Sequence, residues 1–368
     1  MTVQSDLEIA QQLAASIGAV FAVRSITTSV GADRQMRFEG DLLTEPRAAS
    51  ERILSSFKQR GYTARLRTES DHVVVIATRG LFVARPILDV RAAVLFVLTL
   101  VSVLYIGALW EGMTSSEFLQ RPLAGLPFAA TLMGILMAHE AGHYVVSRHF
   151  GMAVSLPYFI PFPLPPFGTM GSVIRAQQPM HDRRQALLIG AAGPLAGLCV
   201  AIPLLVVGLL RSTVQPLILT PGAVMEGNSI LYATIKFVIF GRLLPGGGYD
   251  VFLHPVAMAA WGGLLVTMLN LIPAGQLDGG HVAYALLGKR TRWLNRIVVV
   301  ITLALGFVHP AWWGWAFILL LLGQRSDEPL DDVTPLTAGQ RALAIGMLVL
   351  FVLLFTPKPL VIIGPTGA

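Results

Sequence analysis

Cysteine and charge are both scarce in this chain of 368 residues. There is one cysteine, Cys199, and 13% of the residues are charged, whereas 54% are hydrophobic. A single cysteine excludes an intrachain disulfide and any metal site built from several thiolates. We expect Cys199 to be a small core residue of an apolar helix. The low charge, with a mean hydropathy of +0.66, excludes an ordinary soluble domain and indicates a polytopic membrane protein.

Dense runs of basic residues are also missing, although the formal net charge is +6. The positive charges are scattered through loops, so they indicate membrane topology and no nucleic-acid partner. By the positive-inside rule, the N-terminal part lies in the cytoplasm, because the second apolar run is followed by Arg148, Arg175, Arg183 and Arg184. We expect a multi-pass protein in contact with the lipid bilayer of a prokaryotic plasma (inner) membrane.

Residues 1–85 differ from the rest, because they hold many charges and alternate polar with apolar residues. The pattern predicts three strands and one helix in the order β-α-β-β, which is typical of a small α+β soluble domain. The predicted bounds are Arg34–Leu42, Glu45–Arg60, Thr63–Arg67 and Val73–Thr78.

Residues 86–368 predict an all-α polytopic membrane region with about six or seven transmembrane segments, judged by length. Three glycines in the third segment, Gly190, Gly193 and Gly197, allow close helix approach. His309-Pro310 interrupts the sixth segment, which is either one kinked span or a tight hairpin. The predicted segments are Leu88–Trp110, Leu123–Val146, Ala186–Leu210, Ile230–Leu244, Val251–Ile272, Ile297–Leu322 and Ala342–Phe355.

The most informative motif is H-E-x-x-H in the second segment, formed by His139, Glu140 and His143. Positions i and i+4 share one face of a helix, so the two histidines can present their imidazole nitrogens to one zinc ion. Glu140 lies beside them and can take a proton from a water at the metal. Ionisable groups inside a bilayer are expensive, so we interpret this cluster as a functional site rather than as hydrogen-bonded core histidines.

A catalytic zinc site usually has three protein ligands, so a third is expected. The best candidate is Asp278, which follows an apolar span. Pro273, Gly275 and Gly279 break that helix, and irregular backbone at membrane depth survives only where protein or a wet cavity covers it. A carboxylate at such a break is interpreted as the third ligand; the alternative is a solvated residue at a helix end.

H-E-x-G-H on one segment, followed by N-x-x-P-x-x-x-L-D-G from Asn270 to Gly279, resembles the site-2 protease family of intramembrane zinc metalloproteases. Gly193–Gly197 resembles the third core helix of that family, and no insert resembling a PDZ domain is found. The stretches Ser155–Pro163, Phe167–Ser172 and Leu253–Ala257 are similar to its EGY-type branch. The resemblance covers about residues 88–357.

The resemblance implies a three-helix catalytic core at about 123–147, 186–210 and 251–287. It implies one zinc ion per chain, held by His139, His143 and Asp278, with Glu140 as the catalytic carboxylate. It further implies hydrolysis of peptide bonds within or near the transmembrane helices of membrane-protein substrates. Asn270 is a candidate hydrogen-bond donor to the oxyanion, although a bond at the helix break explains it equally well.

The proline-rich segment after the zinc motif has two interpretations. It is either a loop or, as the family resemblance favours, a strand at 168–174 that pairs with an unwound substrate. Three other functions compete with proteolysis: a non-catalytic membrane scaffold of the same fold, a zinc-dependent hydrolase of a non-peptide substrate, and a zinc transporter. Intact motif residues disfavour the scaffold, and the lack of a His-rich loop disfavours the transporter.

Overall fold

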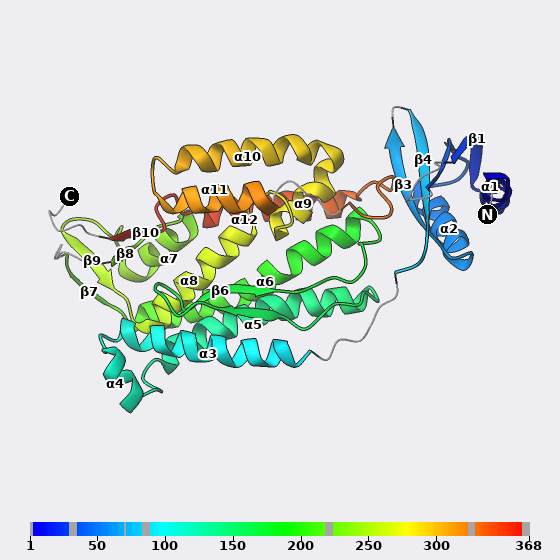
Figure 1. Cartoon of the computed structure of the whole chain (residues 1–368). Coiled ribbons are helices and arrows are strands. Elements are labelled where there is room, and N and C mark those ends of the chain that lie inside the picture. Colours follow the sequence, from blue (N-terminus) through cyan, green and yellow to red (C-terminus); the bar gives the residue numbers. More distant parts are fainter. Residues whose placement is uncertain are drawn as a thin grey trace.

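The computed structural model describes residues 3–28, 35–69, 71–82, 89–217, 224–322 and 328–362. Most of these residues are helical, and the small sheets lie at the two ends of the molecule and beside the helices (Figure 1). The N-terminal elements sit at one end of the helical region, which they meet through a segment near residue 331.

The N-terminal part folds as a four-stranded antiparallel sheet, in the order β1-β2-β4-β3, with two helices. The three predicted strands and the predicted helix are all found, although Arg34 lies outside the described residues. Helix α1 and strand β1 were not predicted. A bulge between Val23 and Ser25 disturbs the alternation along β1 and hides the strand signal. The bounds are α1 Val3–Ile17, β1 Phe21–Thr28, β2 Met36–Leu42, α2 Pro46–Gln59, β3 Tyr62–Glu69 and β4 His72–Arg79.

Residues 330–332 connect the N-terminal sheet to the helical region through backbone hydrogen bonds on both sides. The Leu66 N–H on β3 donates to the Leu330 carbonyl at 2.7 Å, and the Leu330 N–H donates to the Met180 carbonyl at 2.8 Å. The buried Asp331 carboxylate accepts a hydrogen bond from Ser50 Oγ on α2 at 2.6 Å. Because buried polar groups need partners, these bonds hold the sheet against the segment that leads into α6.

The helical region contains ten α-helices among the described residues, together with three two-stranded antiparallel sheets. The sheets pair β5 Tyr158–Pro161 with β6 Thr169–Val173, β7 Thr213–Pro216 with β9 Tyr249–Phe252, and β8 Val224–Glu226 with β10 Leu360–Ile362. The helices are α3 Val90–Trp110, α4 Ser115–Gln120, α5 Leu126–His149, α6 Arg183–Leu210, α7 Ile230–Phe240, α8 Pro255–Asn270, α9 Asp278–Leu287, α10 Thr291–Leu305, α11 Ala311–Leu322 and α12 Ala338–Leu354. The region is therefore mostly helical rather than all-α.

Two helices among the described residues, α3 and α6, are long and apolar enough to cross a membrane. Four shorter apolar helices accompany them: α7, α8, α11 and α12. The count of six or seven transmembrane segments therefore stays a prediction. The predicted first segment began at Leu88, which lies outside the described residues.

Two predicted segments differ from the structure in more than their bounds. Residues 251–252 belong to β9, and α8 begins only at Pro255, where the His254 ring accepts the Val256 N–H at 3.2 Å. Proline suits the first helical turn because its missing N–H would have no partner there. The segment 297–322 is two helices, α10 and α11, that lie side by side (Figure 1). Of the two alternatives, the hairpin is correct.

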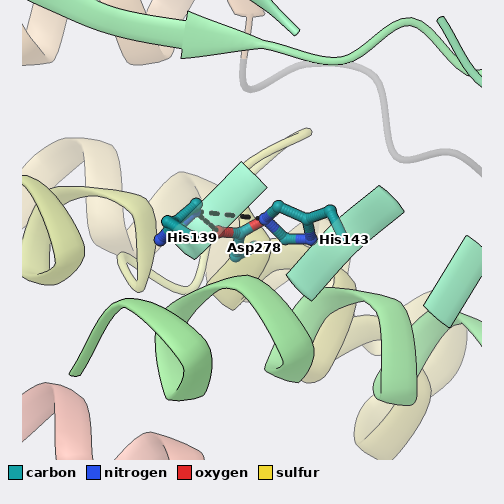
Figure 2. Close-up of side chains that lie close together, drawn as sticks. All are labelled: His139, His143 and Asp278. Carbon is teal, nitrogen blue, oxygen red and sulfur yellow. Dashed lines mark hydrogen bonds and ion pairs between the residues drawn. The ribbon is translucent and has the colours of Figure 1, made fainter. Parts of the chain in front are cut away.

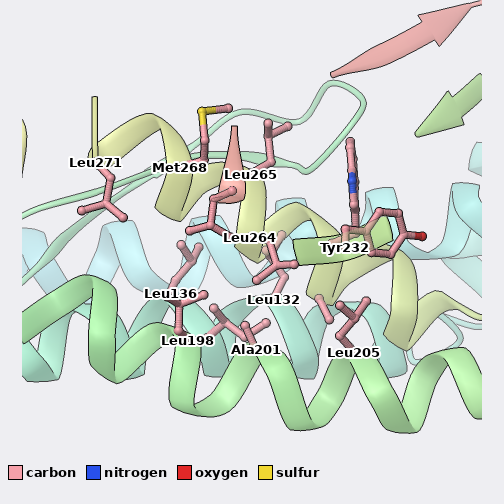
Figure 3. Packing of buried hydrophobic residues seen from close by; sticks show 14 of the residues in the cluster. Leu132, Leu136, Leu198, Ala201, Leu205, Tyr232, Leu264, Leu265, Met268 and Leu271 are labelled. Atoms are coloured by element: carbon pink, nitrogen blue, oxygen red, sulfur yellow. The ribbon is translucent and has the colours of Figure 1, made fainter. Parts of the chain in front are cut away.

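Helices α5, α6 and α8 pack against one another around the largest buried apolar cluster (Figure 3). Leu132 and Leu136 from α5 meet Leu198 and Leu205 from α6, with Leu264 from α8 beside them. The helices come from three distant parts of the chain, and the third predicted core segment is divided into α8 and α9 by a loop. Their close packing forms a rigid frame for the side chains described below.

The beginning of α6 is fixed by charged residues just before its apolar stretch. Asp182 accepts the Gln185 N–H at 2.7 Å, and Asp332 accepts Arg183 Nε at 2.8 Å. Burial alone would raise the pKa of Asp182, but the contact with His181 and the bond from Gln185 N–H lower it below its usual value. An ionised carboxylate at this helix N-terminus is stabilising.

Cys199 on α6 is exposed, so the prediction of a core position is wrong. Helix α6 is apolar on all sides, and its sequence has no polar stripe that separates an inner from an outer face. In a membrane-length helix, the exposed side faces a surface that lipid can cover.

Candidate metal centre

Helix α5 presents His139 and His143 to the same point, as their spacing predicts. The two Nε2 atoms lie 3.1 Å apart, and both side chains are largely buried. The Nδ1 atom of His143 lies 2.9 Å from the Ile189 carbonyl oxygen on α6. A carbonyl accepts only, so Nδ1 carries the proton and Nε2 presents a lone pair.

Asp278 reaches the histidines from the far side of the helix break. Helix α8 ends at Asn270, and the loop turns at Gly275, whose φ is +59°, before α9 starts at Asp278. A Cβ at Gly279 would lie 2.0 Å from the Leu271 carbonyl oxygen, so only glycine lets the loop fold back this closely. The break thus directs the carboxylate toward α5 (Figure 2).

The carboxylate oxygens of Asp278 lie 3.2 Å from His139 Nε2 and 3.3 Å from His143 Nε2. Oδ2 is buried and accepts no hydrogen bond of acceptable geometry among the described residues, although His139 Nε2 lies 3.2 Å from it. The Nε2 lone pair of His143 and the Asp278 carboxylate therefore face one another, an arrangement that a cation stabilises. Ligand atoms about 2.0–2.2 Å from a tetrahedral zinc would lie about 3.3–3.5 Å apart, which these separations approach. The three residues fit zinc, and they form the one such group of three among the described residues.

Two glycines of α6 let this helix lie directly against the histidines. A Cβ at Gly193 would lie 2.1 Å from His143 Nε2, and one at Gly197 would lie 3.3 Å from the Cβ of His139. The close approach predicted from these glycines is therefore confirmed.

Replacing Gly193 by alanine is expected to displace the His143 ring and to reduce zinc binding, because the new methyl group would overlap that ring. The bound metal can be measured by elemental analysis of purified protein. Gly134→Ala on α5 is the matched control, since no atom lies within 4 Å of the added Cβ. Equal zinc content in both variants would contradict the packing argument.

Glu140 contacts strand β6. Its Oε1 accepts a hydrogen bond from Ser172 Oγ at 2.7 Å, and the residue is 6% exposed. It also lines an apolar cavity of about 450 Å³ between α3, α5 and β5, together with Phe96, Ala141 and Phe159. The carboxylate thus lies between the metal cluster and a space that could receive apolar groups.

Asn270, the last residue of α8, lies beside the cluster, with Nδ2 3.4 Å from His139 Nε2. The structure therefore brings all five predicted site residues into one region, although Glu140 and Asn270 are not in the His-His-Asp group. Two contacts of the site were not predicted from the sequence: those with the Ile189 carbonyl and the Ser172 hydroxyl. A carbonyl carries no sequence signal, and Ser172 was noted only as part of a motif.

Comparison with known proteins gives a family for this region. Residues 127–309 match the family model described as Peptidase family M50. The probable zinc metalloprotease EGY2, chloroplastic, of Arabidopsis thaliana is 30% identical over 238 residues, which cover 64% of this chain and 42% of the relative. The probable zinc metalloprotease EGY1, chloroplastic, of the same plant is 31% identical over 242 residues, which cover 64% and 43%.

A third relative, the probable zinc metalloprotease EGY2, chloroplastic, of Oryza sativa subsp. indica, is 27% identical over 246 residues, covering 66% of this chain and 44% of the relative. The chain spans less than half the length of these curated relatives. The matched region contains the His-His-Asp group, which could hold a metal ion, and the relatives that match it are named as zinc metalloproteases.

Proposed function

The chain carries a peptidase family M50 domain, the domain of site-2 proteases, at residues 127–309, and on this premise we propose that it is an intramembrane zinc metalloprotease. It hydrolyses peptide bonds within or near the transmembrane helices of membrane-protein substrates. The observation that carries the proposal is the buried group of His139, His143 and Asp278, which lies against the membrane-length helix α6.

The apolar surroundings of the site support a position inside the bilayer. His139 is buried on a 24-residue helix, about 36 Å long at 1.5 Å per residue, whose length alone is enough to span a hydrocarbon core. Ionisable groups at such depth are expensive and are retained where they have a function. In this proposal residues 86–368 form the membrane domain, and residues 1–85 form a cytoplasmic α+β domain. The membrane is the plasma membrane of a prokaryote.

Each site residue has one role in the proposed reaction. His139, His143 and Asp278 would hold a zinc ion, which would supply Lewis acidity for the scissile carbonyl and the attacking water. Glu140 takes a proton from that water and passes it to the leaving amine. Asn270, through its side-chain amide N–H, donates a hydrogen bond to the developing oxyanion. The surrounding apolar side chains limit the water that reaches the site.

A transmembrane substrate has to unwind before its peptide bonds can be attacked, because a helix uses them in its own hydrogen bonds. Strand β6 lies at the predicted strand position and pairs only with β5 among the described residues. We assign its remaining edge to an extended stretch of substrate, held by backbone hydrogen bonds as in β-augmentation. The apolar cavity beside Glu140 would then receive a substrate side chain.

The test is cleavage of a single-span membrane protein by the purified chain in detergent micelles, followed by mass spectrometry of the products. We expect cleavage within or near the span, loss of cleavage after zinc chelation, and recovery when zinc is restored. A panel of substrates with helix-breaking residues in the span should be cut faster. Cleavage confined to soluble loops would overturn the intramembrane assignment. Zinc binding without cleavage of any panel member would favour the scaffold or the non-peptide hydrolase.

A further inference from the structure

The carboxylate of Glu140 is held by a residue from another part of the chain. Ser172 on β6 donates from Oγ to Glu140 Oε1 at 2.7 Å, across 32 positions of sequence. This is the one hydrogen bond that the described part of the chain gives to the Glu140 carboxylate. We propose that Ser172 is a positioning residue, which fixes the orientation of Glu140 and couples it to strand β6. The inference rests on the proposed function and deepens it.

The hydroxyl of Ser172 is directed differently from that of its neighbour Thr169 on the same strand. Thr169 Oγ1 donates to the Ile160 carbonyl at 2.9 Å and accepts the Gly171 N–H at 3.1 Å, so it serves the β5–β6 hairpin itself. Ser172 is paired with Phe159 through the backbone, and its side chain leaves the hairpin to reach α5. One strand thus contains a hairpin-stabilising hydroxyl and a hydroxyl that serves the site.

The position of Ser172 links substrate binding to the alignment of the carboxylate. A glutamate side chain has several rotamers, and only some of them place its oxygens for proton transfer. A hydrogen bond from a fixed strand selects among them before substrate arrives. If an extended substrate adds to the free edge of β6, it orders the strand that holds Ser172 and thereby Glu140. Displacing a reacting group by about 1 Å can lower a rate by about 100-fold.

The experiment compares Ser172→Ala and Ser172→Thr with Thr169→Val, the matched loss of a hydroxyl on the same strand. For Ser172→Ala we expect kcat to fall by about 10–100-fold, with KM and zinc content near wild type. Ser172→Thr keeps the donor and should recover most of kcat. Thr169→Val should instead lower the melting temperature and raise KM, because it loosens the hairpin, and any fall in kcat should be smaller than in Ser172→Ala.

A measurement without substrate tests the contact directly. The infrared carboxylate band of Glu140 is obtained as the difference between each protein and its Glu140→Gln derivative. We expect the band to shift in Ser172→Ala, to return in Ser172→Thr and to stay in place in Thr169→Val, because only the first variant removes the donor.

The two readouts separate the inference from the function on which it rests. If Ser172→Ala leaves the band unchanged, or lowers only stability and raises KM as Thr169→Val does, Ser172 has a structural role and the inference is overturned. If the band shifts but the wild-type protein cleaves no membrane substrate, the protease proposal fails while the contact with Glu140 stands. A shifted band together with a fall in kcat supports both.

Discussion

A Glu140→Gln variant is expected to lose cleavage by about 10²–10⁴-fold in kcat, the range attributed to a positioned general base, while it retains zinc. Glutamine has nearly the size of glutamate, and its amide oxygen can still accept the Ser172 hydroxyl that now bonds Oε1. What it lacks is a basic oxygen that can take a proton. Because Glu140 lies outside the His-His-Asp group, the metal ligands stay intact.

Cleavage should be followed under single-turnover conditions, with zinc quantified in the same samples, so that slow product release does not hide the chemical step. Glu111→Gln is the matched control: it makes the same carboxylate-to-amide change at an exposed position at the end of α3. We expect it to behave as wild type. Full activity in Glu140→Gln would remove this residue from the reaction, and loss of zinc would mean that it supports the metal.

Local periodicity explains why the histidine pair could be predicted. The i and i+4 spacing fixes His139 and His143 on one face of any regular helix, whatever packs against it. Asp278 is separated from them by more than a hundred residues, and only the chemistry of zinc and the family motif connected it to the site. Neither helical spacing nor the ligand chemistry of zinc indicates that the Ser172 hydroxyl contacts the site. Its contact with Glu140 exists because the hairpin folds back onto α5.

The difference between local patterns and tertiary packing also explains where the prediction of the fold was wrong. Helices that are apolar on every side have no periodicity that marks an inner face, so Cys199 was assigned to the core although it is exposed. Short apolar runs do not distinguish a strand from a helix, so residues 251–252 were included in a helix. The contact of the N-terminal sheet with residues 330–332 is set by tertiary packing, which no local pattern encodes.

The other large effect is expected at Asp278, where an alanine should abolish stable zinc binding and cleavage together. The variant leaves two imidazoles, which is fewer than the three protein ligands of a usual catalytic zinc site. Loss of a partner outside the ligand set already lowers zinc affinity by about 10–100-fold, so loss of a ligand should exceed that range. Competition with a chromogenic chelator gives the affinity, and the melting temperature without zinc shows whether the apoprotein is still folded.

Asp278→Asn makes the argument more specific, because it keeps the side-chain volume and one oxygen but removes the negative charge. We expect zinc affinity to fall in the order wild type, Asp278→Asn, Asp278→Ala, since an amide oxygen is a weaker zinc ligand than a carboxylate. Asp250→Asn on β9 makes the same exchange away from the cluster and should keep wild-type affinity. Wild-type zinc content in Asp278→Ala would exclude Asp278 as a ligand. A loss of zinc here, beside its retention in Glu140→Gln, would separate the residues that hold the metal from the one that moves the proton.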